Sequence, residues 1–357
     1  MFRPTDRSIR RSAATDLDVL TRPEMLGEVI ADETGDPRWK SLEARLISGG
    51  KSNLTFELVA EPGSLILRRP PDGELLPRAH DMGRETLVQR ALQRTSVPVP
   101  RIVLEDVSGD LLGVPFYVME KVEGHVVRDS LPTGYADSTA EKLQLANGLV
   151  DVLVELHGID AEAVGLGSFG KAEGFLERQI GLWTGQWNRS KTHDVPVVDA
   201  LATKLATMIP RSRRSAIVHG DFRLDNCVMD PVTPGMVSAV LDWEMSSLGD
   251  PMTDVAMLLF FWFEPDEAAP ILVPSVTRSE GFPAKAHLAE RYAERSGVDL
   301  DGLVFYEALA NFKFAVISQG IASRVVAGAM AGQEFGDLES EIGRFARIGL
   351  DKLDGHG

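Results

Sequence analysis

Two carboxylates, a carboxamide and a histidine lie close together in two short segments of the sequence. The segment VHGDFRLDN contains His219, Asp221 and Asn226, and the later segment VLDWE contains Asp242. Each segment begins with apolar residues typical of a strand, which predicts that the polar side chains lie on loops at strand ends. Carboxylate and amide oxygens are ligands that Mg2+ prefers, and a carboxylate is a common general base. These residues therefore provide the material for one base and two metal ligands.

Two other chemistries do not fit the sequence. The seven histidines lack the HExxH spacing of a zinc site, and the one cysteine, Cys227, supplies no set of thiolates. A Ser-His-Asp hydrolase would need a GxSxG turn, which does not occur. Cys227 follows Asn226 directly, and we expect it to be a small buried residue rather than a nucleophile.

A glycine-rich segment far upstream, SGGKSN, is a candidate phosphate-binding turn. It covers residues 48 to 53, and its candidate residues are Ser48, Gly49, Gly50, Ser52 and Asn53. Glycines between two strands allow backbone N–H groups to approach a phosphate closely. No helical pattern follows directly, so a P-loop is not predicted. An ordinary hairpin turn is the alternative interpretation, and the segment taken alone favours it.

Residues 42 to 124 are predicted to form a five-stranded antiparallel sheet with one helix. Three alternating runs separated by turn formers are followed by two more strands, and the apolar spacing of residues 79 to 94 predicts an amphipathic helix between them. Arg68 ends the third run, where its charge would neutralise phosphates, and Glu85 on the helix is placed to reach it. The neighbouring Arg69 is interpreted as a solvated charge at a strand edge.

From residue 143 onward the apolar spacing becomes mostly helical. We expect helices at residues 143 to 158, 195 to 210, 284 to 296, 302 to 328 and 335 to 353, in addition to one at 23 to 34. His157 ends the first of these and is expected to be a cap or a core hydrogen-bonding residue. Thr253 or Asp254 is a candidate cap for the apolar helix that follows residue 251.

Aromatic residues are concentrated between residues 160 and 195. They include Phe169, Phe175, Trp183 and Trp187. Core packing of a helix pair is the favoured interpretation. The alternative is a wall that faces the substrate, because aromatic rings offer apolar area and cation-π contacts together.

Composition limits the class of protein. The 357 residues predict about two domains, and 44% hydrophobic residues suffice for a core. A formal charge of -16 argues against binding to nucleic acid. The longest apolar stretches are too short or carry charges, so we expect no membrane span. The basic start lacks an apolar run, and the single cysteine fits a reducing compartment, so a cytoplasmic protein is expected. Nothing in the sequence specifies an oligomeric state.

The ordered set of glycine turn, cation, helix glutamate, HGDFRLDN and LDWE resembles the aminoglycoside phosphotransferase family, relatives of the protein kinases. The match covers roughly residues 40 to 330, and the forms GDFRLDN, LRRPP and KFAVISQG are similar to the branch with phosphotransferase domains fused to acyl-CoA dehydrogenases. The resemblance implies an α+β, bilobal protein-kinase-like fold. Its expected parts are a leader and helix at 1 to 40, a nucleotide-binding lobe with the antiparallel sheet at 41 to 124, and a mostly helical catalytic and substrate-binding lobe at 125 to 357.

The same resemblance implies roles for the candidate residues. Asp221 would accept or orient the substrate hydroxyl proton, and His219 would brace the loop. Asn226 and Asp242 would bind Mg2+. The implied nucleotide site consists of the glycine turn, Arg68 in the place usually held by lysine, Glu85 as its partner, the Glu120 carbonyl and the Val122 N–H.

We therefore expect a small-molecule kinase that transfers the γ-phosphoryl group of ATP or GTP to a hydroxyl with Mg2+. The alternative is a catalytically weak nucleotide-binding pseudokinase or scaffold, which Arg68 in the lysine place favours. The phosphate acceptor stays open between an aminoglycoside, a hydroxyacyl thioester and another small alcohol or sugar.

Overall fold

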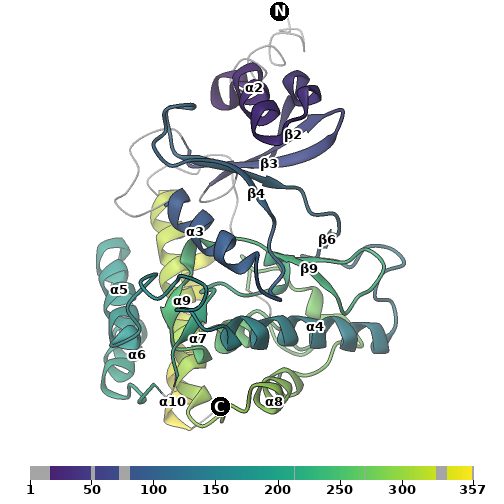
Figure 1. The fold of residues 1–357 in the computed structure, drawn as a ribbon. Helices are drawn as coiled ribbons and strands as arrows, with labels where there is room; N and C mark the ends of the chain where they lie inside the picture. The colour runs from purple at the N-terminus through teal and green to yellow at the C-terminus, as the bar shows by residue number, and fades with distance from the viewer. Residues whose placement is uncertain are drawn as a thin grey trace, which may run out of the picture. The chain divides into compact units, whose positions relative to one another are not determined.

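The computed structural model describes residues 17–49, 53–71, 81–212, 214–268, 270–326 and 336–355 (Figure 1). The chain divides into two compact units. Unit 1 contains Met1–Glu123 together with the short segment Asp242–Glu244, and unit 2 contains Gly124–Leu241 and Met245–Gly357. The segment at Asp242 therefore belongs with residues that precede it by more than a hundred positions, a grouping that the sequence did not indicate.

Unit 1 is built on a five-stranded sheet, as predicted. The strands are β1 (Glu43–Gly49), β2 (Leu54–Ala60), β3 (Gly63–Arg69), β4 (Ile102–Asp106) and β5 (Phe116–Glu120). Their order is β1-β2-β3-β5-β4, and every neighbouring pair is antiparallel. Strand β3 lies in the middle of the sheet, with β2 on one side and β5 on the other.

Helices complete the core of unit 1. They are α2 (Pro23–Thr34), the 3-10 helix η1 (Pro37–Ser41) and α3 (Met82–Leu92). Leu26 and Ile30 of α2 are fully buried in one cluster with Phe56, Leu58 and other strand residues. This packing removes apolar surface from water, the main driving force for folding.

Arg69 corrects one prediction. Its side chain is buried, and its guanidinium donates hydrogen bonds to the Leu20 carbonyl at 2.7 Å and the Pro70 carbonyl at 3.1 Å. The prediction of a solvated edge charge was wrong because β3 is a central strand, and a buried cation in a sheet must find acceptors within the protein.

Unit 2 is mainly helical (Figure 1). Its helices are α4 (Thr139–Gly158), α5 (Phe175–Ser190), α6 (Pro196–Thr207), α7 (Met252–Phe260), α8 (Lys285–Ser296), α9 (Leu303–Val326) and α10 (Leu338–Asp354). The start of α4 precedes the expected one because Ser138 and Glu141 form a reciprocal capping box there. The expected end of α9 at residues 327 and 328 lies outside the described residues.

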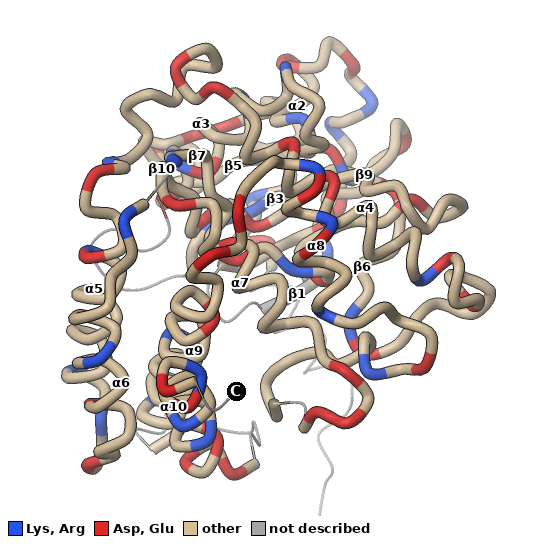
Figure 2. Tube along the Cα trace, turned by 90° about the horizontal axis from the view of Figure 1, so that it is seen from below, with Lys and Arg blue, Asp and Glu red and all other residues tan. Residues whose placement is uncertain are grey.

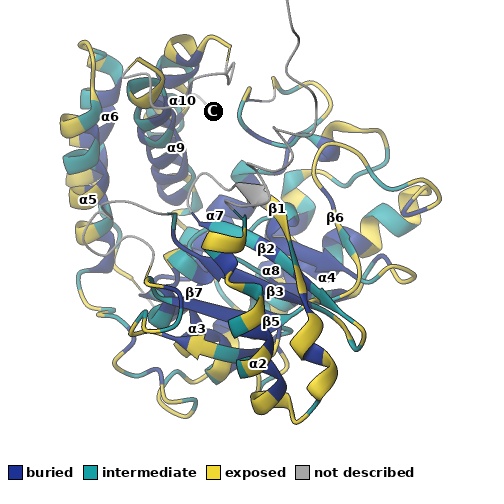
Figure 3. Cartoon of the chain, turned by 90° about the horizontal axis from the view of Figure 1, so that it is seen from above, coloured by how far each residue is buried: buried dark blue, intermediate teal, exposed yellow. Residues whose placement is uncertain are grey.

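Helix α9 is the central element of this helical region. Most of its residues are buried, as the dark blue ribbon in Figure 3 shows, and it packs against α5, α6, α7 and α10. Helix α10 buries Leu338, Ile342, Phe345 and Ala346, and acidic and basic residues are spread along its length (Figure 2). No helix in the described part of the chain has both the length and the apolar composition needed to cross a membrane.

Short strands and 3-10 helices hold the loops of unit 2. The strands are β6 (His125–Val126), β7 (Ala216–Val218), β8 (Cys227–Met229), β9 (Val237–Val240) and β10 (Ser247–Gly249), and the 3-10 helices are η2 (Leu224–Asn226), η3 (Trp243–Met245), which straddles the two units, and η4 (Val276–Arg278). Strands β6, β8 and β9 form one sheet, and β7 pairs with β10. The apolar runs before the polar segments therefore are strands, as predicted.

The aromatic residues between 160 and 195 belong to the core. Phe169, Phe175, Trp183 and Trp187 are all buried, and the Trp187 indole N–H donates to Asp199 at 2.7 Å. This confirms core packing over the substrate-facing wall. Cys227 is also buried, and burial raises the pKa of its thiol, so a nucleophilic role is disfavoured as expected.

Candidate active site

The loop from His219 to Asn226 connects β7 to β8 and carries the candidate base. Gly220 has φ 83°, a conformation that an L-residue adopts only with strain. A Cβ at this position would lie 2.6 Å from the Met245 carbonyl oxygen. Glycine is therefore required both by the backbone conformation and by the close approach of Met245.

Asp221 is held by two side chains of its own loop. The Asn226 amide donates to the Asp221 carboxylate at 3.0 Å and to the Asp221 carbonyl at 2.8 Å. Arg223 donates from Nε to the same carboxylate oxygen at 3.1 Å. A carboxylate fixed by two donors has a defined direction, which is what a base that must align a hydroxyl requires.

Arg223 is a site residue that was missed at the sequence level. Its guanidinium bridges Asp221 to Asp225, where the N–O distance is 3.0 Å, and lies over the Phe261 ring with 4.8 Å to the centroid. Burial raises the pKa of Asp225, while the charge of Arg223 acts in the opposite direction. The signal available in the sequence was a cation two positions after the candidate base.

His219 has the geometry of a brace. Its buried imidazole accepts the Asp221 backbone N–H at Nδ1, at 3.2 Å, and contacts the Leu241 carbonyl through Nε2 at 2.9 Å. Since Nδ1 is the acceptor, Nε2 carries the proton. The ring therefore ties the loop to the end of β9, immediately before Asp242.

Asp254 fixes the same loop from α7. Its carboxylate accepts the backbone N–H groups of His219 and Gly220 at 2.6 and 2.7 Å. The His157 Nε2 lies 3.2 Å away and its Nδ1 is 2.9 Å from the Tyr292 hydroxyl. Burial alone would raise the pKa of Asp254, but the interactions with His157 and His219 outweigh it and lower the pKa.

These contacts settle two sequence-level alternatives. His157 is a core hydrogen-bonding residue, as expected, because its ring is buried between Tyr292 and Asp254. Neither Thr253 nor Asp254 caps α7, since both lie inside that helix, and the N–H of Met252 at the helix start is accepted by the Asp250 carboxylate at 3.0 Å. The carboxylate of Asp254 instead accepts hydrogen bonds from two backbone N–H groups of the loop, which would otherwise need water as a partner.

In unit 1, Arg68 is surrounded by three carboxylates. Its guanidinium lies 2.5 Å from Asp242, 3.3 Å from Glu85 and 3.5 Å from Glu244. The expected contact between Arg68 and Glu85 is thus present. The contact with Asp242 was not predicted, and it gives Arg68 a carboxylate partner besides Glu85.

Glu85 is almost fully buried beneath this cluster. It accepts the Tyr117 hydroxyl at 2.9 Å and the Asn53 amide at 3.3 Å. Burial raises the pKa of Glu85 to about 7, although the charge of Arg68 acts in the opposite direction. Asn53 also donates to Glu244 at 3.2 Å, so this residue of the glycine-rich segment joins the carboxylate cluster.

The remaining candidate nucleotide residues occupy different settings. Ser48 and Gly49 pair with Thr55 and Leu54 and so belong to β1, which extends further than expected. Gly50 and Ser52 lie outside the described residues. Glu120 ends β5 and its side chain pairs with Arg101 at 2.8 Å. Val122 follows the strand, and within the described part of the chain no hydrogen bond of its backbone N–H is found.

The two candidate magnesium ligands offer suitable atoms. Asn226 directs its amide nitrogen at Asp221, which leaves its carbonyl oxygen as the atom for a cation. Asp242 uses one carboxylate oxygen for Arg68 and retains a second. It has φ 67°, which aspartate tolerates better than most residues. Hard oxygen atoms of this kind fit Mg2+.

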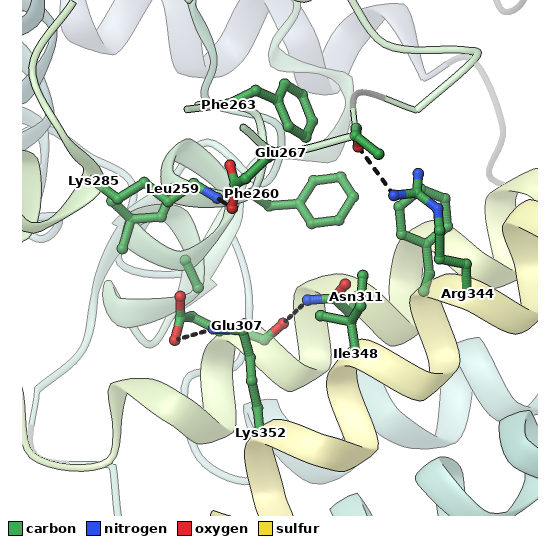
Figure 4. Close-up of a pocket in the computed structure, with 13 residues that line it drawn as sticks. Leu259, Phe260, Phe263, Glu267, Lys285, Glu307, Asn311, Arg344, Ile348 and Lys352 are labelled. Carbon is green, nitrogen blue, oxygen red and sulfur yellow. Dashed lines mark hydrogen bonds and ion pairs between the residues drawn. The ribbon is translucent and has the colours of Figure 1, made fainter. Parts of the chain in front are cut away.

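A separate cavity of about 200 Å³ lies among the helices of unit 2 (Figure 4). Its walls include Phe260, Phe263 and Phe345. Two ion pairs border it, Lys285 with Glu267 at 2.5 Å and Lys352 with Glu307 at 3.2 Å. Each carboxylate is therefore neutralised within the protein, and the cavity offers aromatic surface rather than net negative charge.

Comparison with known proteins places this arrangement among the phosphotransferases. Residues 43–296 match the model of the phosphotransferase enzyme family. Acyl-CoA dehydrogenase family member 11 from Rattus norvegicus is 37% identical over 305 residues, which cover 84% of this chain and 39% of that protein. The chain thus spans about two-fifths of the length of this relative. We conclude that it belongs to the phosphotransferase enzyme family.

Solved structures agree with this assignment. A protein from Ralstonia eutropha, provisionally described as an aminoglycoside phosphotransferase, superposes with TM-score 0.75 at 33% identity, covering 88% of this chain and 93% of that one. Aminoglycoside phosphotransferase APH(4)-Ia, solved with ADP and hygromycin B, has TM-score 0.59 at 16% identity and covers 91% and 98% of the two chains. The second likeness shows the fold alone, which is α+β as expected.

Proposed function

We propose that this protein is a small-molecule kinase that transfers the γ-phosphoryl group of ATP or GTP to a hydroxyl group. The observation that carries the proposal is the fixed carboxylate of Asp221, held by Asn226 at 3.0 Å and Arg223 at 3.1 Å. Membership of the phosphotransferase enzyme family supports it.

Asp221 is the proposed base. In phosphoryl transfer the protein mainly positions the reactants and neutralises charge, and one residue orients the attacking hydroxyl. Asp221 takes that role, and His219 holds its backbone N–H rather than exchanging a proton with substrate. Asn226 and Asp242 are the proposed magnesium ligands. When bound, the ion would neutralise phosphate charge.

The nucleotide residues are proposed from unit 1. The glycine-rich segment would cover the phosphates, Arg68 with Glu85 would face them, and Glu120 and Val122 would meet the base. APH(4)-Ia, which shares this fold, was solved as a complex with ADP, and this supports a nucleotide as the co-substrate here.

The test is a transfer assay with purified protein, Mg2+ and ATP or GTP. Asp221→Asn should lower the rate by about 10²-fold or more, because the base is lost, while the Kd for the magnesium nucleotide changes little. Asp230→Asn is the matched control, since this aspartate accepts the backbone N–H groups of Val232 and Thr233 in the turn after β8. Transfer that survives Asp221→Asn would contradict the proposal.

The acceptor is to be found with a mass-shift screen. The rat relative belongs to the acyl-CoA dehydrogenases by name, which places hydroxyacyl thioesters in the panel. APH(4)-Ia was solved with hygromycin B, which places aminoglycosides there. Small alcohols and sugars complete the set. A phosphorylated product from one of these groups would identify the substrate class.

A nucleotide-binding protein without transfer is the second candidate. The 2.5 Å contact of Arg68 with Asp242 favours it, because Arg68 occupies one carboxylate oxygen of a proposed metal ligand. Thermal stabilisation by magnesium nucleotide without any phosphorylated product across the panel would support this candidate over the first.

A further inference from the structure

Lys313 is a buried cation that the proposed mechanism has not yet used. It lies on α9 between the buried residues Phe312 and Phe314, and only 8% of its surface is exposed. Its ammonium donates to the Gly220 carbonyl at 2.5 Å and lies over the Trp183 ring, 5.5 Å from the centroid. A charge in this position requires an explanation.

Stability does not supply that explanation. Removing an ammonium from water costs several kcal/mol, and a carbonyl and an aromatic face return only part of it. Burial lowers the pKa of Lys313, while the negative charges of Asp221 and Asp254 act in the opposite direction. An apolar side chain of similar length would fill the same space without the cost of desolvation.

The hydrogen bond from Lys313 to the Gly220 carbonyl shows what the buried charge does: it holds the backbone next to Asp221. The peptide group between Gly220 and Asp221 has its oxygen held by Lys313 and its N–H held by His219 Nδ1 at 3.2 Å. The N–H of Gly220 is held by Asp254 at 2.7 Å. Thus the peptide that carries the candidate base is fixed from α9 and from its own loop, and the peptide before it is fixed from α7.

Helix α9 also acts on the carboxylate end of Asp221. Phe314, the residue after Lys313, packs edge-on against Phe261 with 6.0 Å between centroids, and Phe261 lies under the Arg223 guanidinium. Arg223 in turn holds the Asp221 carboxylate. Two consecutive residues of one buried helix therefore support both the backbone and the side chain of the base.

We propose that Lys313 is a positioning residue for phosphoryl transfer, which fixes the Gly220–Asp221 peptide and so the location of Asp221. The catalytic part of this inference rests on the proposed function of Asp221. The structural part, that Lys313 restrains the loop, can be tested without turnover.

Hydrogen exchange tests the restraint in the full chain. Lys313→Met should speed exchange of the backbone amides in residues 218 to 226, since the oxygen of one peptide loses its donor. The melting temperature should stay equal to or above that of wild type. Lys204→Met on α6, which removes an ion pair with Asp354, is the matched control and should leave this loop unchanged. Unchanged exchange in Lys313→Met would overturn the inference.

Transfer kinetics test the consequence. Lys313→Met should lower kcat on the order of 10²-fold, as expected for a misplaced reacting group, with the Kd for magnesium ATP within about twofold of wild type. An unaltered kcat would overturn the positioning role. If Asp221→Asn shows that Asp221 is not the base, the proposed function fails, and the exchange experiment still decides whether Lys313 restrains the loop. Lys313→Gln serves both experiments if the methionine variant does not fold.

Discussion

Arg68 and Asp242 are separated by 174 positions in the sequence, yet the guanidinium of one donates to the carboxylate of the other at 2.5 Å. The carboxylates of Glu85 and Glu244 lie within 3.5 Å of the same guanidinium. One cation therefore balances three potential anions. A magnesium ion at Asp242 would share this carboxylate with Arg68.

Removal of Arg68 should make the stability of the protein depend more strongly on Mg2+. Arg68→Met should lower the free energy of unfolding in metal-free buffer by about 3 kcal/mol, because the buried Glu85 and the partly exposed Asp242 and Glu244 lose their partner. Mg2+ should then raise the melting temperature of the variant more than that of wild type, since the ion supplies the missing charge. Calorimetry with and without Mg2+ measures both effects. Arg45→Met on the exposed strand β1 is the control, and an equal response to Mg2+ would refute the idea.

Glu85 should make stability depend on pH. Its pKa is raised by burial to about 7 from 4.5, so the folded protein retains this proton at pH values where the unfolded chain has released it. This contribution to stability is complete below pH 4.5 and is lost as the pH rises through about 7. The free energy of unfolding of wild type minus that of Glu85→Gln should fall by up to about 3 kcal/mol across this window.

Urea unfolding at a series of pH values, without metal ions, measures this difference. Glu61→Gln changes an exposed glutamate of the same unit and serves as the control. A difference between wild type and Glu85→Gln that is flat from pH 4.5 to about 7 would show that Glu85 ionises normally.

Replacing Asp254 should lower both the free energy of unfolding and the rate of transfer, because its carboxylate holds the loop that carries Asp221. Asp254→Asn places an amide group where two backbone N–H donors converge, and should lower the free energy of unfolding by about 3 kcal/mol. Because its pKa is lowered in the folded protein, the contribution of Asp254 is present above its ordinary pKa and is lost as the pH falls. Denaturation and transfer assays check this. Asp151→Asn, at a partly exposed pair with Arg291, should behave like wild type.

Arg223 should affect transfer more than nucleotide binding. Arg223→Met frees the carboxylate of Asp221 and should lower kcat on the order of 10²-fold. Arg223→Lys should have an intermediate effect, because lysine keeps the charge but cannot bridge two carboxylates in the same way. Steady-state kinetics and nucleotide titration separate the two quantities. The exposed Arg128, 3.9 Å from Asp225, offers a control in Arg128→Met.

Local patterns predicted the elements of the fold. The alternating runs became β1 to β5, and helical spacing located α2, α3, α4, α6, α8, α9 and α10 within a few residues. Strand order is not a local property. Strand β5 lies between β3 and β4, and no spacing in the sequence specifies that order. Arg69 is buried because its guanidinium meets the carbonyls of Leu20 and Pro70, contacts that the strand pattern does not show.

Among the contacts of the candidate site, the sequence predicted only those within one loop or between a strand and the helix that follows it. Asp221 and Asn226 are in one segment, and Arg68 and Glu85 follow a strand-then-helix pattern. Lys313 contacts Gly220 across a sequence separation of 93 positions, and Asp254 contacts it across 34. A lysine inside an apolar helix was the available signal for Lys313, but the sequence does not show which carbonyl it meets.

The assignment of Asp242–Glu244 to unit 1 has a consequence for any attempt to dissect the protein. A fragment that ends at Glu123 would contain Arg68 and Glu85 without Asp242 and Glu244. Its central cation would lose two of its three counter-charges, although every strand of the sheet was present. A shuffled hybrid with a relative would meet the same difficulty unless both donor pieces came from one parent. Unit 1 is therefore encoded by two separate stretches of the gene, and both must be transferred together to keep it intact.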